Sequence, residues 1–249
     1  MLNKTPSTKR FRNLPPDSEV SRLRSSKFFL FPSLIYEQHL WDAGYTQIAG
    51  IDEAGRGAWA GPVCAAALIL PTDPAILQAL DQVRDSKLMT PQSRETWAPR
   101  IRLAAVAWGV GFASSQEIDT LGILPATKLA ATRALANLSA STDPPSPAPS
   151  LFSAHSSFLP DYLLTDFLLL PELERNQTAL IKGDRLSLSV AGASVLAKTA
   201  RDALMRELDL RYPGYGFARH KGYGTRLHQQ SIHQLGLSEI HRKSFSIHF

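Results

Sequence analysis

The sequence predicts an α/β domain with a mixed sheet flanked by helices and a helical C-terminal part. Three observations predict this class. Short apolar runs bounded by Gly and Pro alternate with segments whose apolar residues have helical spacing. The last long helical segment ends at a Tyr-Pro-Gly turn. The chain has 249 residues, of which 44% are hydrophobic, and this is enough to bury a substantial core.

Each element follows from the period of its apolar residues and from the breakers beside it. Four apolar runs predict strands over 45–51, 63–70, 106–113 and 162–170. The first two are expected to pair with each other inside the sheet, because both are short and bounded by Gly or Pro. Segments with helical spacing predict helices over 91–104, 124–138 and 187–210.

Two segments have no regular apolar spacing. Residues 1–33 combine prolines, serines and basic side chains, which predicts a flexible basic arm. Residues 139–160 contain the sequence STDPPSPAPS, which predicts a Pro/Ser-rich surface insertion. We therefore expect one folded domain over residues 34–249 that carries this insertion.

Composition excludes several classes of protein. The longest apolar stretch, residues 58–70, is shorter than the roughly 20 residues of a membrane-spanning helix, so no membrane association is expected. The basic arm lacks the cleavage site of an export signal. The single cysteine, Cys64, excludes an intramolecular disulfide and favours a reducing compartment.

Charge is distributed unevenly along the chain. The formal net charge is +5, yet residues 34–197 are acidic while residues 1–33 and 198–249 are basic. This asymmetry is expected if carboxylates hold metal ions while Lys and Arg contact a polyanion. The alternative is that these side chains only solvate the surface of the protein.

Two carboxylates follow the first predicted strand directly. Asp52 and Glu53 end an apolar run, and a Gly-Arg-Gly turn comes next, formed by Gly55, Arg56 and Gly57. Side chains of neighbouring strand residues point to opposite faces, so the two acids can share one site only if the strand ends there and the chain turns. The two glycines permit such a turn and a close approach of backbone amides to a ligand. An ordinary polar turn after a strand is the alternative.

Two further acids stand in unusual places. Asp166 lies within an apolar run, where an unpaired carboxylate carries a large desolvation cost, so it requires a cation or hydrogen-bond donors. Asp184 precedes the long C-terminal helix. The alternatives are a structural ion pair for Asp166 and a helix cap for Asp184. Four oxygen donors without a paired His or Cys favour Mg²⁺ or Mn²⁺ over zinc.

A fourth cluster, residues 215–225, interleaves aromatic, glycine and basic residues and includes Lys221 and Tyr223. Such a mixture can stack on sugars or bases while its cations contact phosphates. A polar loop with aromatic anchors in the core has the same composition. The earlier segment Asp85-Ser86-Lys87 is open to both interpretations as well.

Taken together, these segments resemble the type 2 ribonuclease H family, ribonuclease HII. The matching blocks, in chain order, are AGIDEAGRGAWAGPV, DSKLMT, ILPATKLAATRAL, the Asp166 strand, KGD, AGASVLAKTARDALM, YPGYGFARHKGYGT and HRKSF. They cover roughly residues 34–245, and several ordered blocks matching at once are highly specific. The sequence departs from the family at Phe167, where glycine is usual, and in the longer segment 139–160.

The resemblance implies a ribonuclease H-like fold and a site in which four acids converge on two divalent ions, Mn²⁺ or Mg²⁺. These acids are Asp52, Glu53, Asp166 and Asp184. It implies that the Gly55-Arg56-Gly57 loop senses the ribose 2′-hydroxyl and that Tyr223 stacks on the sugar beside the scissile phosphate. Lys87 and Lys221 join the substrate-binding set.

We expect the basic C-terminal part to contact phosphates as well, through Lys198, Arg201, Lys221 and Arg242. For Arg201, an internal ion pair with its neighbour Asp202 is the alternative.

The implied activity is that of an endonuclease with a two-metal mechanism. It would hydrolyse the RNA strand of RNA/DNA hybrids and nick 5′ of ribonucleotides embedded in duplex DNA, leaving 5′-phosphate and 3′-hydroxyl ends. The resemblance also implies a cytoplasmic monomer. Two alternatives are another two-metal phosphodiesterase and a nucleic-acid-binding module without catalysis.

Overall fold

The computed structural model describes residues 31–140 and 158–246. Most of the predicted arm 1–33 and of the predicted insertion 139–160 therefore lies outside the described residues. The described helices are α2 (Ile35–Asp42), α3 (Ile76–Ala79), α4 (Pro91–Ala104), α5 (Ser115–Leu121), α6 (Ile123–Ala136), α7 (Gly183–Leu186), α8 (Leu188–Arg211), α9 (Phe217–His220) and α10 (Arg226–Leu235), with short 3-10 turns at Ser86–Leu88 and Pro171–Leu173.

A mixed sheet forms the centre of the fold. Its strands are β1 (Ile48–Ala54), β2 (Val63–Ile69), β3 (Ala107–Ala113), β4 (Ser139–Ala140), β5 (Tyr162–Asp166) and β6 (Asn176–Leu180). Their order in space is β4-β3-β2-β1-β5-β6. The pairs from β4 to β1 are antiparallel, while β5 runs parallel to both β1 and β6.

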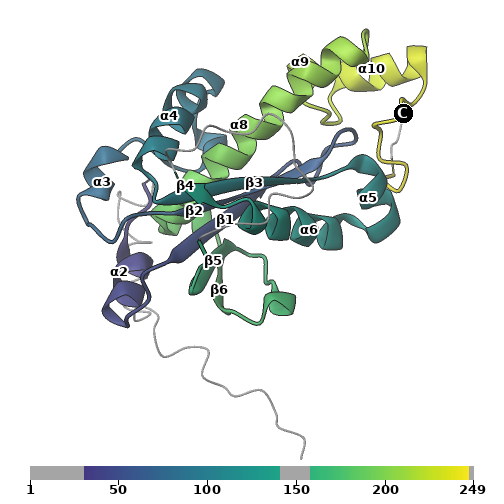
Figure 1. Ribbon diagram of the computed structural model, residues 1–249. Helices are drawn as coiled ribbons and strands as arrows, with labels where there is room; N and C mark the ends of the chain where they lie inside the picture. The colour runs from purple at the N-terminus through teal and green to yellow at the C-terminus, as the bar shows by residue number, and fades with distance from the viewer. Residues whose placement is uncertain (1–30, 141–157, 247–249) are drawn as a thin grey trace, which may run out of the picture.

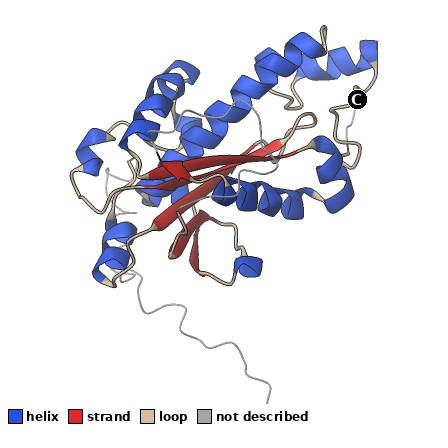
Figure 2. Cartoon of the chain, in the orientation of Figure 1, coloured by secondary structure: helices blue, strands red, loops and turns tan. Residues whose placement is uncertain are grey.

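Helices cover both faces of this sheet (Figures 1 and 2). α8 packs across β1 and β2 on one face with α4 beside it, and α6 packs on the other face against β2 and β3. α9 and α10 lie at the far end of α8, beyond the sheet. The predicted fold class, a mixed sheet flanked by helices with a helical C-terminal part, is confirmed.

The sequence of β2, VCAAALI, explains how two helices can share one strand. All of its residues are buried. Alternate side chains serve the two faces: Cys64, Ala66 and Leu68 join the core under α8, while Ala65 and Ala67 join the core under α6. Small side chains let the helices come close to the sheet.

Close approach is most pronounced at Gly50 of β1. A Cβ atom at this position would lie 2.2 Å from the carbonyl carbon of Ser189 in α8. Only a residue without a side chain permits this contact between strand and helix. It holds the strand that carries Asp52 directly against the start of α8.

The observed helices and strands differ from the predicted ones in several bounds and in number. The run 162–170 was expected to be one strand, but β5 ends at Asp166. Phe167 has φ of 62°, which leaves the extended conformation. The sequence pattern also missed α2, α3, α5, β6, α7, α9 and α10. It missed β4 as well, because Ser139 and Ala140, which pair with β3, were assigned to the insertion. The first strand begins at Ile48 and continues to Ala54 rather than ending at residue 51. None of the described helices combines the length and apolarity of a transmembrane segment.

A chain of buried imidazoles joins the C-terminal helices. His228 donates from Nδ1 to the carbonyl oxygen of Tyr223 (3.1 Å). His241 accepts at Nδ1 from the amide of Ser238 (2.8 Å), so its Nε2 carries the proton and donates to Nε2 of His228 (3.0 Å). Each ring in this chain is neutral.

The buried imidazoles predict acid sensitivity of the fold. Burial lowers the pKa of both His228 and His241 to about 4, against about 6.5 in the unfolded chain. The unfolded chain therefore binds more protons between these values, and the stability is lost as pH falls. The two imidazoles together should lower the free energy of unfolding by roughly 4 kcal/mol from pH 7 to pH 5, about 2 kcal/mol each, measured by urea denaturation as the difference between the unmodified protein and its histidine variants.

A matched pair of variants tests the cause. His241→Gln should flatten the pH dependence, because one of the two depressed pKa values is removed. His233→Gln, at an exposed position of α10, should leave it unchanged. Equal slopes in the three proteins would contradict the assignment.

Candidate active site

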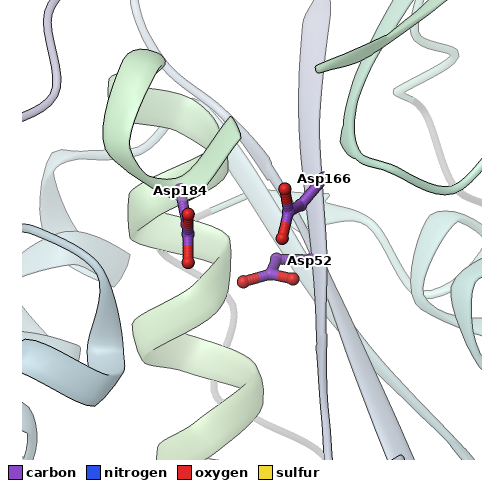
Figure 3. Close-up of side chains that lie close together, drawn as sticks. All are labelled: Asp52, Asp166 and Asp184. Atoms are coloured by element: carbon purple, nitrogen blue, oxygen red, sulfur yellow. The ribbon is translucent and has the colours of Figure 1, made fainter. Parts of the chain in front are cut away.

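Three carboxylates converge where the neighbouring strands β1 and β5 approach the short helix α7 (Figure 3). Asp52 lies in β1, Asp166 is the last residue of β5, and Asp184 lies in the short helix α7. One carboxylate oxygen from each lies within 4.8 Å of the others. β1 and β5 are parallel neighbours with Ile51 paired to Thr165, so the residues that follow reach the same edge together.

Backbone geometry on both sides holds these acids in place. The amide of Gly183 donates to Oδ1 of Asp166 (2.8 Å), which ties the end of β5 to the start of α7. Lys182, just before it, has φ of 60°, and this left-handed residue turns the chain from β6 into α7. The amide of Glu53 donates to Oδ1 of Asp52 (2.7 Å).

Burial and neighbouring negative charges disfavour the charged forms of Asp52 and Asp184. Burial, followed by the charge of Glu53, raises the pKa of Asp52 well above its usual range. Burial and the charges of Asp85 and Asp166 raise the pKa of Asp184 to about 6. Bringing a cation among these oxygens would relieve both penalties.

Glu53 is not among the three acids whose oxygens lie within 4.8 Å of one another, although its charge acts on Asp52 and that of Asp166 acts on it. β1 continues through Asp52 and Glu53 to Ala54, so the strand does not end at residue 51, and the condition stated above for the two acids to share one site is not met by a strand end. Glu53 instead accepts a hydrogen bond from Nη1 of Arg56 at 3.2 Å. Burial is the largest effect on its pKa, which is raised although Arg56 opposes the shift.

Basic side chains line the other side of the acids. Nζ of Lys87 lies 3.7 Å from Oδ2 of Asp184, and 77% of the Lys87 side chain is exposed. Burial lowers the pKa of Lys87, but the charges of Asp184 and Asp85 outweigh it and raise the pKa. Lys87 is thus a solvent-facing cation beside Asp184.

Asp85 has a structural role that the sequence left open. It is buried, accepts from the amide of Lys87 (2.9 Å) and pairs with Nη2 of Arg185 (3.2 Å). Arg185 and Ser194 carry no sequence signal of their own. Ser194 donates its hydroxyl proton to Oγ of Ser86 (2.9 Å), which ties α8 to the segment that holds Lys87.

The Gly-Arg-Gly turn meets the segment that holds Tyr223. Gly55 is buried with φ of 92°, while Gly57 is exposed and no atom lies within 4 Å of where its Cβ would be. The amides of Trp59 and Ala60 both donate to the carbonyl oxygen of Gly222 (2.8 and 3.2 Å). The two substrate-binding segments predicted from sequence are therefore neighbours in space.

Tyr223 is half-buried beside cations. Its ring centre lies 5.5 Å from the guanidinium carbon of Arg201 and 5.6 Å from Nζ of Lys198. Lys221 is also half-buried, and its ammonium donates to the carbonyl oxygen of Ala218.

The expected phosphate contacts of Arg201 and Arg242 are wrong. Both side chains are 0% exposed, and among the described residues each donates only to backbone carbonyl oxygens. The alternative ion pair of Arg201 with Asp202 is not formed either, because Asp202 pairs with Arg94 (3.4 Å) and Lys198 (2.7 Å). A buried guanidinium cannot reach a nucleic acid that binds at the surface.

Phe167 occupies a left-handed position that glycine adopts without strain. Its amide donates to the carbonyl oxygen of Leu180 (2.9 Å), so β5 stays attached to β6. The ring is 68% exposed. Asp166 thus keeps its place among the acids although an aromatic residue follows it.

Comparisons with known proteins agree with this geometry. The family model described as Ribonuclease HII matches residues 49–248. The chain is 44% identical to ribonuclease HII of Dehalococcoides mccartyi over 216 residues, which cover 86% of this chain and 93% of that protein. It is 47% identical to ribonuclease HII of Synechococcus sp. over 217 residues, which cover 86% and 88%.

Solved structures share the fold at lower identity. Ribonuclease H2 from Pyrococcus horikoshii superposes with a TM-score of 0.60 at 24% identity, covering 81% of this chain and 94% of that one. Bst-RNase HIII in complex with Mn²⁺ superposes with a TM-score of 0.55 at 20% identity, covering 82% and 68%. The ordered sequence blocks, the ribonuclease H-like sheet and these relatives lead to one conclusion: the chain belongs to the ribonuclease HII family and is a ribonuclease H.

Proposed function

We propose that this ribonuclease H cuts the RNA strand of RNA/DNA hybrids and nicks duplex DNA on the 5′ side of embedded ribonucleotides, leaving 3′-hydroxyl and 5′-phosphate ends. One observation carries the proposal: Asp52, Asp166 and Asp184 come from three distant segments and meet within 4.8 Å beside the Gly-Arg-Gly turn of a ribonuclease HII chain. We propose Asp52, Glu53, Asp166 and Asp184 as its catalytic acids.

The donor set fits hard divalent cations. All three grouped ligands are carboxylates, which suit Mg²⁺ and Mn²⁺ and leave positions open for water and phosphate oxygens. The Mn²⁺ complex of Bst-RNase HIII supports the same class of ion. A pair of such ions activates water and stabilises the charge on the attacking and leaving oxygens. Asp52, Asp166 and Asp184 would hold them, with Glu53 completing the set.

The protein's own groups would place the substrate. Lys87 offers an exposed ammonium beside Asp184, where a phosphate would pass. Gly55, Arg56 and Gly57 would sense the ribose 2′-hydroxyl through their backbone, and Tyr223 would stack on the adjacent sugar. Lys221 would contribute a further phosphate contact. None of these groups reads a base edge, so cleavage would be independent of sequence.

We further propose that residues 34–249 form one catalytic domain and that residues 1–33 add a basic arm. The arm carries seven basic and two acidic residues, which supports a role near nucleic acid. The protein would act as a cytoplasmic monomer without membrane contact, as the family resemblance implies.

Incubation with defined duplexes tests the function. We expect purified protein to nick a DNA duplex with one ribonucleotide, 5′ of that residue, in Mg²⁺ or Mn²⁺ but not with chelator. An all-DNA duplex should stay intact, because it lacks the 2′-hydroxyl. Equal cutting of both duplexes would favour another phosphodiesterase, and binding without any cutting would favour a binding module.

Removal of one central charge tests the acids. We expect Asp52→Asn to reduce kcat by about 10³-fold or more, because an electrostatic group at the reaction centre is lost. The melting temperature should rise, since a neutral amide avoids the cost of burying a charge and the repulsion by Glu53 that together raise the pKa of Asp52. Both are measured on the same preparation by gel assay and thermal denaturation.

The control is Asp73→Asn, at an exposed aspartate outside the group, which should change neither quantity. Activity of Asp52→Asn close to that of the unmodified protein would refute the assignment.

A further inference from the structure

Two arginines are completely buried and bound to the backbone. Arg242 donates from Nη2 to Gly55 (2.7 Å), from Nη1 to Arg56 (2.8 Å) and from Nε to Gly61 (3.0 Å), in each case to the carbonyl oxygen. Arg201 donates in the same way to Pro62 (2.8 Å), Lys221 (3.0 Å) and Ala60 (3.2 Å).

Within the described part of the chain, neither guanidinium has a carboxylate partner; the nearby Asp202 is taken by Arg94 and Lys198. Burial of an unpaired cation is costly, so dipoles must satisfy it. The carbonyl oxygens of residues 55–62 supply most of those dipoles. We call residues 55–62 the sensor loop.

Other segments fasten the same loop from outside. The amide of Arg242 donates to the carbonyl oxygen of Trp59, and the amide of Gly61 donates to that of Ile240 (both 2.8 Å). A Cβ at Gly55 would lie 1.9 Å from Nε of Arg201, so this guanidinium packs directly on the loop backbone. The sensor loop is therefore held by α8, by the segment around Gly222 and by the segment around Arg242.

One peptide of this loop combines a bound carbonyl with a free amide. The carbonyl of Arg56 and the N–H of Gly57 belong to the same peptide group. Arg242 donates to that carbonyl, and a cation bound there polarises the peptide and strengthens its N–H as a donor. Among the described residues none accepts a hydrogen bond from the Gly57 amide, and Gly57 is exposed.

We propose that Arg242 is a positioning residue for recognition of the ribose 2′-hydroxyl. It fixes and polarises the peptide between Arg56 and Gly57, so that the Gly57 amide is presented as a rigid donor to the hydroxyl oxygen. This inference rests on the proposed function. It gives a buried arginine, remote from the substrate, a role in telling RNA from DNA.

The test combines protein variants with a change of one substrate atom. Duplexes carry either one ribonucleotide or its 2′-fluoro analogue at the same position, because fluorine cannot replace the hydroxyl in hydrogen bonding. Cleavage rates are measured in Mg²⁺, and dissociation constants by fluorescence anisotropy with chelator. The quantity compared is the ratio between the two duplexes for each protein, as in a double-mutant cycle.

We expect Arg242→Lys to lower this ratio roughly tenfold, the loss of one strengthened hydrogen bond. Lysine keeps the charge but cannot bind three carbonyls at once. The neutral variant Arg242→Gln leaves no bare charge in the core and should lower the ratio equally if Arg242→Lys fails to fold. Arg133→Lys is the control, because Arg133 also donates to a backbone carbonyl, that of Phe112, away from the site.

The outcomes separate two kinds of failure. If the unmodified protein does not distinguish the two duplexes, the proposed function itself fails. If it distinguishes them and the Arg242 variants keep the same ratio while only their overall rate falls, Arg242 is merely structural and the inference is overturned. A tenfold lower ratio in the Arg242 variants, with an unchanged ratio in Arg133→Lys, supports it.

Discussion

Repulsion between carboxylates is the constraint on which the site depends. Asp52 and Asp184 are buried, and their pKa values are raised by burial and by neighbouring charges. Holding these carboxylates together in their charged forms is therefore unfavourable. The parallel pairing of β1 with β5, the Gly183 bond to Asp166 and the contact of Gly50 with α8 keep them together. The packed sheet thus holds three carboxylates in positions that favour the binding of a cation.

The basic residues of the C-terminal part fall into two classes. Lys198 and Lys221 are half-buried and keep part of their surface exposed to solvent. Arg201 and Arg242 instead act inside the protein. Their guanidinium groups donate to carbonyl oxygens of a loop that is neither helix nor strand and therefore lacks regular backbone partners. The same formal charge therefore contributes to surface potential in one class and to backbone rigidity in the other.

Much of the fold and most of the acids could be predicted from sequence, for identifiable reasons. Apolar period identified β2, α4 and α8, and an acid inside an apolar run identified Asp166. β6 was missed because its residues NQTAL are mostly polar and only partly buried, so no alternation is visible. The fate of Arg242 could not be predicted, because a sequence shows that a side chain is charged but not which way it points.

The lone cysteine of β2 has a practical consequence. Cys64 is 0% exposed between the strand and α8, and burial raises the pKa of its thiol, so the thiolate that reacts with alkylating reagents is scarce in the folded protein. Its labelling must therefore wait until the central strand separates from the helix. The rate at which Cys64 is alkylated therefore reports how often the core opens. A cysteine introduced at the surface would react in the folded protein while Cys64 stays unmodified.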